Sequence, residues 1–263
     1  MAETDKLTSA SIHLERGNTY ISQGNYDMAI AEYDKAIEIY PNLVMAYNNR
    51  GIAYAGIGNL DQAIKDHNQA LALDPKYAMA HYFLGRVYSQ KGDFDRAIKY
   101  YTESLRFDPN NAGTFYSRGN TYHDKGEYDL AIKDFNQCIR FDPKNAEAYN
   151  NRGLVYVDKG NFEQAFKDFS DAIRLNPNHA AAYNNRGIQN KKKGNYKQAI
   201  ADYNAALKID QNYVSAYFNR GIAHGLNDDN DLAIADYESV LQIDPNDTDA
   251  RNNLEILRRE RGW

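Results

Sequence analysis

Asparagine side chains recur at a fixed spacing and are the residues of this chain best suited to hold another molecule. An asparagine recurs every 34 residues at Asn151, Asn185, Asn219 and Asn253, and Asn49 lies three such intervals before Asn151. A second asparagine precedes most of them: Asn48, Asn150, Asn184 and Asn252. Because a primary amide offers both donors and acceptors, a row of amides can hold the backbone of an extended peptide whatever its sequence. Asparagine is a poor helix former, which favours this interpretation over capping of local carbonyls or binding of water.

Arginines repeat with the same period, and each is followed by a carboxylate at a constant separation along the chain. The arginines are Arg16, Arg50, Arg118, Arg152, Arg186 and Arg220. Their acidic counterparts are Glu32, Asp66, Asp134, Asp168, Asp202 and Asp236. Where the arginine is missing, at Leu84, the acid is missing too, at Tyr100. This paired presence and absence predicts ion pairs within the fold, and it makes any binding of anionic ligands by these arginines secondary.

Residues for catalysis or metal binding are sparse. The six histidines show no HExxH spacing and no common face, and the single cysteine, Cys138, stands where small packing residues recur. Gly56–Gly58 is too isolated to form a phosphate loop, and the acidic stretch 227–231 lacks the pattern of a calcium loop. The sequence therefore predicts neither an enzyme nor a metal or cofactor site.

The composition of the chain disfavours further classes of protein, namely nucleic-acid-binding, membrane-spanning and secreted proteins. The 263 residues carry a net charge of -5, which disfavours nucleic acid as a partner. No run of about 18 apolar residues is present, so a membrane span is not expected. The N-terminal residues lack a signal-peptide pattern, and we expect a cytoplasmic location.

The asparagines and arginines are carried by seven consecutive repeats of equal length, with positions numbered from 1 to 34 in each. We define the repeats as 10–43, 44–77, 78–111, 112–145, 146–179, 180–213 and 214–247. Residues 1–9 form a polar lead-in, in which Thr8 or Ser9, or the following Ser11, can cap the first helix. The tail, 248–263, is expected to form a C-terminal capping helix, with Ala250, Leu254 and Leu257 facing inward. A fixed period of this length indicates a repeat array.

Glycine and proline divide every repeat into two helices. Glycine stands at repeat position 15 in six repeats and proline at position 32 in six, which predicts a turn in the middle and a helix stop at the end. Glycine at position 8 is invariant although it lies inside a helix. In an antiparallel hairpin it faces position 24, where an aromatic ring recurs, and a small residue against a ring gives dense packing. The predicted fold is all-α.

This phase pattern resembles the tetratricopeptide repeat (TPR) family. The resemblance rests on an aromatic residue at position 4, Gly at 8, Tyr at 11, Ala at 20, an aromatic residue at 24 and Pro at 32, over nearly the whole chain. It implies a right-handed superhelical solenoid of antiparallel helical hairpins, with the first helix of each repeat lining a concave groove. The residues that the family's carboxylate clamp requires are missing here, so a chaperone adaptor of that kind is not expected.

The resemblance also implies which side chains face the groove. The asparagine row would lie there, as a similar row does in the superhelix of O-GlcNAc transferase. In the third and fourth repeats the same stripe is aromatic, apolar and basic, which suits ligand side chains; its residues are Met79, Tyr82, Phe83, Arg86, Tyr116, Asn120 and His123. Filling of gaps between neighbouring helices is the alternative for this second group.

We therefore expect a non-catalytic scaffold that binds an extended peptide or partner segment through its asparagine row. One alternative is a self-assembling structural module that packs through the groove, or through the basic sixth and acidic seventh repeats, as a homo-oligomer. The other is RNA binding in the manner of other helical repeats, which the net charge of -5 disfavours.

Overall fold

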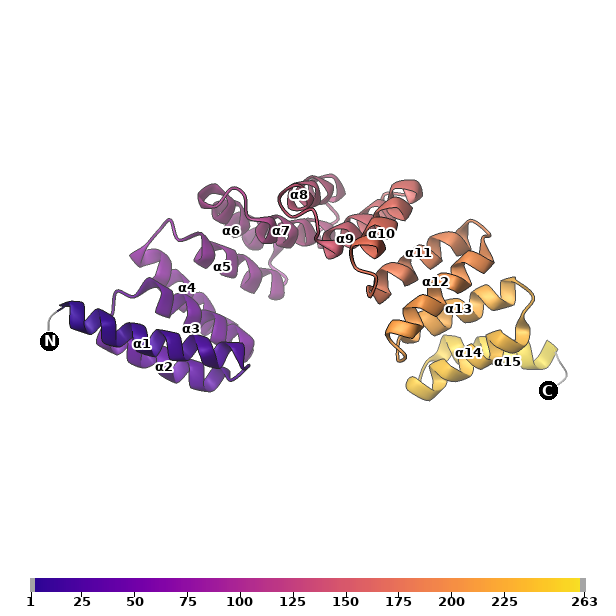
Figure 1. Ribbon diagram of the computed structural model, residues 1–263, viewed down its shortest axis with the longest axis horizontal. Coiled ribbons are helices and arrows are strands. Elements are labelled where there is room, and N and C mark those ends of the chain that lie inside the picture. Colours follow the sequence, from indigo (N-terminus) through magenta and orange to yellow (C-terminus); the bar gives the residue numbers. More distant parts are fainter. Residues whose placement is uncertain (1–2, 261–263) are drawn as a thin grey trace. The chain divides into compact units, whose positions relative to one another are not determined.

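The computed structural model describes residues 3–260, which form fifteen α-helices and no strand (Figure 1). The helices divide into two compact units. The first unit contains α1 (Glu3–Ser22), α2 (Tyr26–Ile39), α3 (Val44–Gly56), α4 (Leu60–Leu73), α5 (Ala78–Gln90), α6 (Phe94–Phe107), α7 (Ala112–Asp124) and α8 (Tyr128–Phe141). The second contains α9 (Ala146–Asp158), α10 (Phe162–Leu175), α11 (Ala180–Lys192), α12 (Tyr196–Ile209), α13 (Val214–Leu226), α14 (Asn230–Ile243) and α15 (Thr248–Glu260).

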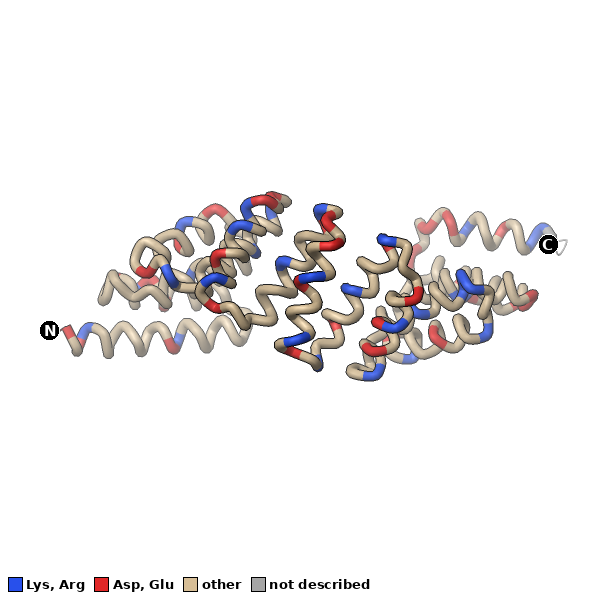
Figure 2. Tube along the Cα trace, turned by 90° about the horizontal axis from the view of Figure 1, so that it is seen from above, with Lys and Arg blue, Asp and Glu red and all other residues tan. Residues whose placement is uncertain are grey.

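Consecutive helices pair into hairpins, and within each unit the hairpins stack in chain order (Figure 1). Each odd-numbered helix from α1 to α13 is the first of a repeat and packs against the even-numbered helix that follows it. Charged residues of both signs are spread along the helices (Figure 2). The predicted all-α array of helical hairpins is confirmed.

The first helix begins earlier than the sequence predicted. α1 starts at Glu3, so most of the predicted lead-in is helical, with Glu3 and Asp5 in the first turn, where acidic side chains are favourable. Thr8 and Ser11 therefore cap nothing. Their hydroxyls donate to the carbonyls of Thr4 and Leu7, both at 2.9 Å, within the helix.

Glycine at position 15 closes each first helix in a left-handed conformation. The six glycines have φ between 72° at Gly24 and 80° at Gly58, a region that glycine enters without steric penalty. In the last repeat Asp228 takes this place, with φ 63°. The prolines at position 32 lie in the turns between hairpins, where they end one helix and do not start the next.

The contact predicted between glycine at position 8 and the ring at position 24 is present in all seven repeats. A Cβ atom placed on Gly85 would lie 2.6 Å from Tyr101 Cδ1, and one on Gly119 would lie 3.1 Å from Phe135 Cε1. The close approach of the two helices therefore favours glycine at this position, most strongly where a Cβ atom would overlap the ring, and this contact compensates for the low helix propensity of glycine.

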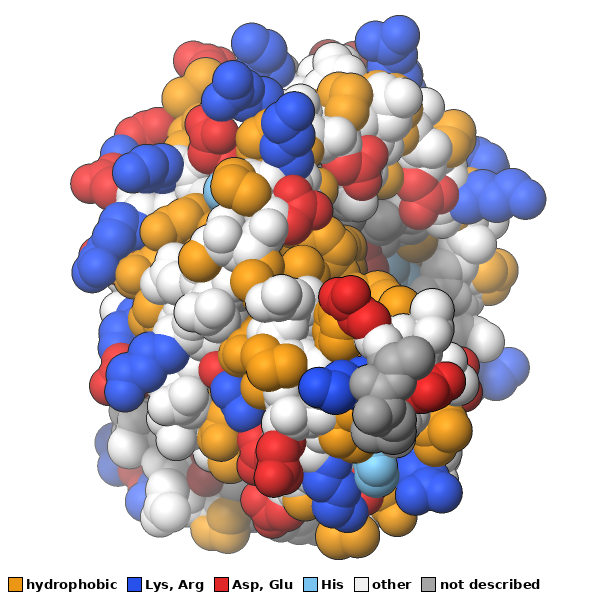
Figure 3. All heavy atoms as spheres, turned by 90° about the vertical axis from the view of Figure 1, so that its left-hand side faces the viewer, with side chains coloured by type: hydrophobic (Ala, Val, Ile, Leu, Met, Phe, Trp, Pro, Cys, Tyr) orange, Lys and Arg blue, Asp and Glu red, His pale blue; other side chains and the backbone are white. Residues whose placement is uncertain are grey.

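The two ends of the array differ in how their apolar surface is covered. At the C-terminal end, Ala250 and Leu254 of α15 are buried against the last hairpin, with Leu257 packed beside them. At the N-terminal end, α1 and α2 expose Leu7, Ile12 and Met28. Figure 3 views this end and shows hydrophobic side chains scattered among charged ones, an ordinary surface composition. The last three residues of the predicted tail, 261–263, lie outside the described residues.

Candidate functional site

The arginine row holds the hairpins together. Five of the six predicted pairs form, each inside one hairpin and each with a buried aspartate. In the second repeat, for example, Arg50 donates from Nε and from a terminal nitrogen to Asp66, at 2.7 and 2.8 Å. Such bidentate pairing matches two nitrogens of the planar guanidinium to the two oxygens of the carboxylate. These arginines are therefore structural, as the sequence predicted.

The sixth predicted pair, Arg16 with Glu32, is not formed. Arg16 is exposed, and Glu32 instead contacts His13 at 2.7 Å and Lys35 at 2.6 Å. Hydrogen bonds from Lys35 and His13 lower the pKa of Glu32. The prediction was wrong here because His13, which stands at position 4 where most other repeats have tyrosine or phenylalanine, and Lys35 bind the carboxylate instead.

Several arginines also reach back to the preceding hairpin, a role that the sequence analysis did not foresee. The second terminal nitrogen donates from Arg50 to Asp34 at 2.6 Å, from Arg118 to Thr102 at 2.9 Å and from Arg220 to Asn204 at 2.5 Å. Each acceptor stands at position 25 of the preceding repeat, so a polar residue at that position was the available signal. One guanidinium thus joins three helices.

The asparagine row forms a chain of hydrogen bonds between repeats. In the second unit, Asn185 Nδ2 donates to Asn150 Oδ1 at 3.0 Å, and Asn219 Nδ2 donates to Asn184 Oδ1 at 3.3 Å. Asn150 and Asn184 are only 4% and 5% exposed. These two predicted peptide-binding residues therefore serve the packing between first helices.

The position-6 asparagines remain accessible in part. Asn49, Asn151, Asn185, Asn219 and Asn253 are all half-buried. Asn185 is oriented through its Nδ2 atom, and its Oδ1 atom has no hydrogen-bond donor within the described part of the chain. In the first unit, Asn49 Nδ2 donates to Asn18 Oδ1 at 2.8 Å, so the same position bridges repeats there too.

An aliphatic row accompanies the asparagine row in the second unit, and the sequence analysis missed it. Its members stand at position 9, one helical turn after the asparagines, on the same face of each first helix and of α15. They are Leu154, Ile188, Ile222 and Ile256. The first three are half-buried and Ile256 is 53% exposed. Their spacing along the chain, equal to that of the asparagines, was the signal that could have revealed them.

Lysines of the sixth repeat border these two rows. Lys191 Nζ donates to Asn219 Oδ1 at 2.9 Å, and burial, with the neighbouring charge of Lys192, lowers the pKa of Lys191. Lys192 and Lys193 lie 5.1 and 5.0 Å from the rings of Phe162 and Phe166 in the preceding repeat. The basic run is thus packed onto a neighbour, with Lys192 and Lys193 still exposed.

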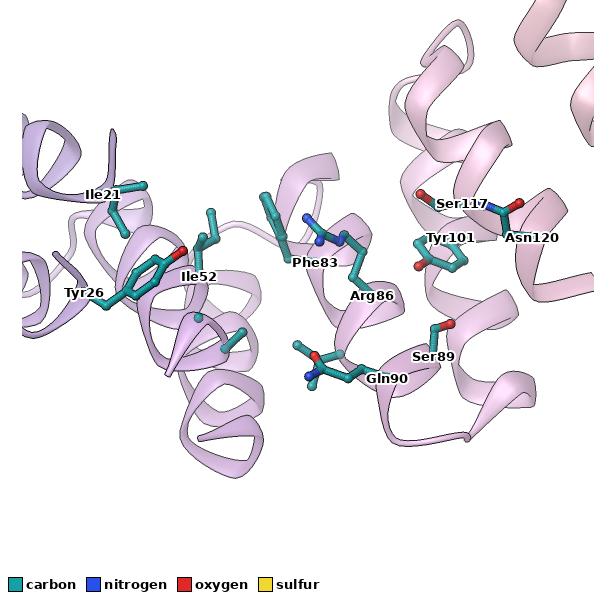
Figure 4. Close-up of a pocket in the computed structure, with 13 residues that line it drawn as sticks. Ile21, Tyr26, Ile52, Phe83, Arg86, Ser89, Gln90, Tyr101, Ser117 and Asn120 are labelled. Carbon is teal, nitrogen blue, oxygen red and sulfur yellow. The ribbon is translucent and has the colours of Figure 1, made fainter. Parts of the chain in front are cut away.

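The first unit contains a pocket of about 560 Å³ between its first helices (Figure 4). Phe83, Arg86 and Gln90 of α5 lie between Ile21, Tyr26 and Ile52 on one side and Tyr101, Ser117 and Asn120 on the other (Figure 4). Burial raises the pKa of Tyr101, so its hydroxyl stays protonated. A second pocket of about 250 Å³ lies next to it, between Asn18, Tyr33 and Asn49, and shares Ile21 and Ile52 with the first.

Three of the seven residues predicted to suit ligand side chains in the third and fourth repeats line the larger pocket: Phe83, Arg86 and Asn120. The other four do not, and one of them, Met79, is 42% exposed. Tyr82 packs against Phe83 and Tyr101, Tyr116 against Phe135, and His123 against Tyr128. Ile21, Tyr26 and Ile52, which also line the pocket, were not predicted.

The described residues contain no cluster of three or more His, Cys, Asp or Glu side chains that could hold a metal ion. Cys138 is completely buried. No helix among residues 3–260 is both long and apolar enough to cross a membrane.

Comparison with known proteins identifies the architecture. Sequence profiles described as "TPR repeat" match residues 17–58, 119–160 and 190–228, and profiles described as "Tetratricopeptide repeat" match 46–112, 100–133, 146–179, 169–201 and 214–247. The chain belongs to the tetratricopeptide repeat family. No curated protein matches this TPR chain.

Solved TPR structures are similar to it. A MamA protein is 29% identical over 64% of this chain and 92% of its own, with a TM-score of 0.57. YrrB, described as a TPR protein with an unusual peptide-binding site, is 25% identical over 70% of this chain and 95% of its own, with a TM-score of 0.58. PilF of Pseudomonas aeruginosa is 21% identical over 82% of this chain and 97% of its own, with a TM-score of 0.71, and shows the fold alone. The TPR array is a scaffold for protein–protein interaction.

Proposed function

We propose that this TPR protein is a non-catalytic scaffold that binds an extended peptide segment along its first helices. Asparagine amides at position 6 would hold the peptide backbone, and the aliphatic row at position 9 would contact its side chains. In the first unit, the pocket around Arg86 would form a binding surface of its own. The likeness to YrrB, which has a peptide-binding site, supports a peptide ligand.

The orientation of Asn185 carries this proposal. Its Nδ2 atom is fixed by the bond to Asn150, which leaves the Oδ1 atom as an acceptor that points away from that bond. A peptide N–H can donate to such an acceptor without any rearrangement of the amide, so the entropy lost on binding is small. Ile188 lies one turn further along the same face of α11 and offers apolar contact beside it.

Removal of the row should weaken peptide binding. We would select peptides from a random display library on the wild-type protein and compare their affinities for the triple variant Asn151→Ala/Asn185→Ala/Asn219→Ala. Each lost hydrogen bond is worth about 1 kcal/mol, so the three substitutions together should lower affinity roughly 100-fold. Circular dichroism and thermal melts would verify that the variant is folded, because the same amides also join neighbouring repeats.

The chain offers a matched control in the same three repeats. Asn178, Asn212 and Asn246 are exposed in the turns that follow the second helices, and they share the even spacing of the row. Replacing all three by alanine should leave affinity unchanged. If the wild type and the triple variant of the asparagine row bind the peptides with equal affinity, the proposed role of the asparagines is refuted. If no peptide binds and the molecular mass in light scattering rises with protein concentration, the result points to self-assembly instead.

A further inference from the structure

We propose that the pocket of the first unit recognises an acidic side chain, Asp or Glu, in an extended peptide, next to a large apolar residue of the same peptide. This inference rests on the proposed function, because it gives the binding surface of the first unit a defined ligand chemistry. It follows from the shape of the pocket, from its single charge and from its continuity with a second pocket.

Small residues at the end of α3 create the space. Ala55 and Gly56 line the pocket where longer side chains would fill it. The ring of Tyr26 lies directly over Gly56, where a Cβ atom would come within 2.6 Å of its Cε1 atom. Ile21, Ile52 and Phe83 complete apolar walls that suit a large aliphatic or aromatic side chain (Figure 4).

Arg86 supplies the only charge among the residues that line this pocket. Its guanidinium carbon lies 5.7 Å from the ring centre of Phe83 and 6.0 Å from that of Tyr82. No carboxylate lies within 4.0 Å of Arg86 anywhere in the described range 3–260, whereas Arg50 and Arg118 at position 7 of the flanking repeats bind buried aspartates.

An arginine that has no acidic partner among residues 3–260, and that is held beside aromatic rings in a pocket with apolar walls on one side, attracts an anion. The planar guanidinium matches the two oxygens of a carboxylate, and the ring contacts keep it oriented before the ligand arrives. The apolar walls strengthen this attraction because they exclude water from part of the contact. A carboxylate with an apolar neighbour therefore fits both features.

The continuity of the two pockets favours a side chain within a peptide over a terminal carboxylate. Ile21 and Ile52 line both pockets, and Asn18 and Asn49 line the smaller one, while Asn120 lies on the opposite side of Arg86. A peptide that places its acidic side chain at Arg86 thus finds apolar and amide groups in both directions. This arrangement suits a chain that continues past the pocket.

Library selection provides the test. Random dodecapeptides would be displayed and selected separately on the wild type, on Arg86→Gln and on Arg140→Gln. Arg140 is a matched control, because it is exposed on α8, lies 5.5 Å from the ring of Phe141 and has no ion pair among residues 3–260. We expect Asp or Glu beside a large apolar residue to be enriched on the wild type and on Arg140→Gln, and the acidic preference to vanish on Arg86→Gln.

A synthetic version of the best acidic peptide would then be compared with its Glu→Gln or Asp→Asn analogue by fluorescence anisotropy. We expect the analogue to bind the wild type roughly tenfold more weakly, and both peptides to bind Arg86→Gln equally. Binding only by peptides with a free C-terminus, absence of acidic enrichment, or acidic enrichment that survives in Arg86→Gln would overturn the inference.

The outcomes also separate this inference from the proposed function. Peptides that lose affinity for the asparagine variant but not for Arg86→Gln would support the scaffold and overturn the acidic specificity. A wild-type selection that enriches no peptide at all would overturn both.

Discussion

The imidazole of His67 occupies the place of the phenol or phenyl ring that faces glycine in the other repeats. It is fully buried, contacts Asn48 Oδ1 through Nδ1 at 3.2 Å and stacks on Phe83 at 5.7 Å. Its Nε2 atom has no hydrogen-bond partner among residues 3–260. Burial lowers the pKa of His67 to about 4. The neutral ring is therefore the form that folding selects.

This burial predicts a pH-dependent stability difference between the wild type and His67→Phe. Because the folded-state pKa lies below the unfolded value of 6.5, the wild type loses stability as pH falls from 6.5 towards 4. The loss amounts to roughly 2 kcal/mol between pH 7 and pH 5. Phenylalanine fits this position in other repeats and does not titrate. Urea unfolding should therefore show that, between pH 7 and pH 5, the free energy of unfolding of His67→Phe increases relative to that of the wild type by roughly 2 kcal/mol. A difference that stays constant with pH would contradict the assignment.

Arg50 and Arg16 stand at the same repeat position but in different surroundings, which gives a second prediction at this scale. Arg50→Gln leaves the carboxylate of Asp66, itself 3% exposed, without its partner, and should reduce the free energy of unfolding by about 3 kcal/mol. Arg16 is exposed and has no ion pair within the described part of the chain, so Arg16→Gln should change stability by less than about 0.5 kcal/mol. Urea titration of both variants checks this, and equal effects would show that the ion pair does not stabilise the hairpin.

At the scale of the helix pair, glycine at position 8 sets two opposing effects against each other. Alanine raises helix propensity by about 1 kcal/mol, but its Cβ atom must fit against the facing ring. At Gly85 that atom would lie 2.6 Å from Tyr101, which forces the helices apart, whereas at Gly119 it would lie 3.1 Å from Phe135, within reach of a small adjustment. We expect Gly85→Ala to destabilise by about 1–3 kcal/mol and Gly119→Ala to be nearly neutral. Thermal melts of the two variants should differ accordingly, and similar melts would rule out steric overlap as the reason for glycine.

Contacts within one hairpin could be predicted from the sequence, whereas contacts between hairpins could not. The repeat pattern is enough to place the helices, the turns and the contacts inside one hairpin, because the two helices of a hairpin run antiparallel. Examples of such contacts are Gly85 with Tyr101 and Arg50 with Asp66. Bonds between hairpins, such as Asn219 to Asn184, depend on which faces of neighbouring hairpins meet, and that pairing is not contained in a rule for a single repeat. For this reason, the prediction that Asn184 binds a ligand did not anticipate that this side chain is buried between repeats.

At the scale of the whole molecule, each hairpin contacts mainly the hairpins next to it in its unit. Stability in such an array is the sum of the repeats and their nearest-neighbour interfaces, so local damage stays local. The capping helix α15 is the place to examine this, because it covers the last hairpin through Ala250 and Leu254 and has no hairpin beyond it among the described residues.

Leu254→Ala removes a side chain that is 5% exposed and should destabilise the cap and its hairpin by about 2–3 kcal/mol. Because α1 to α8 form a separate compact unit, we expect hydrogen exchange to accelerate in α13, α14 and α15 and to remain unchanged in α1 to α8. Ile256→Ala in the same helix is the matched control, since Ile256 is 53% exposed and its loss leaves no cavity. Faster exchange throughout the chain in Leu254→Ala would instead mean that the protein unfolds as one cooperative body.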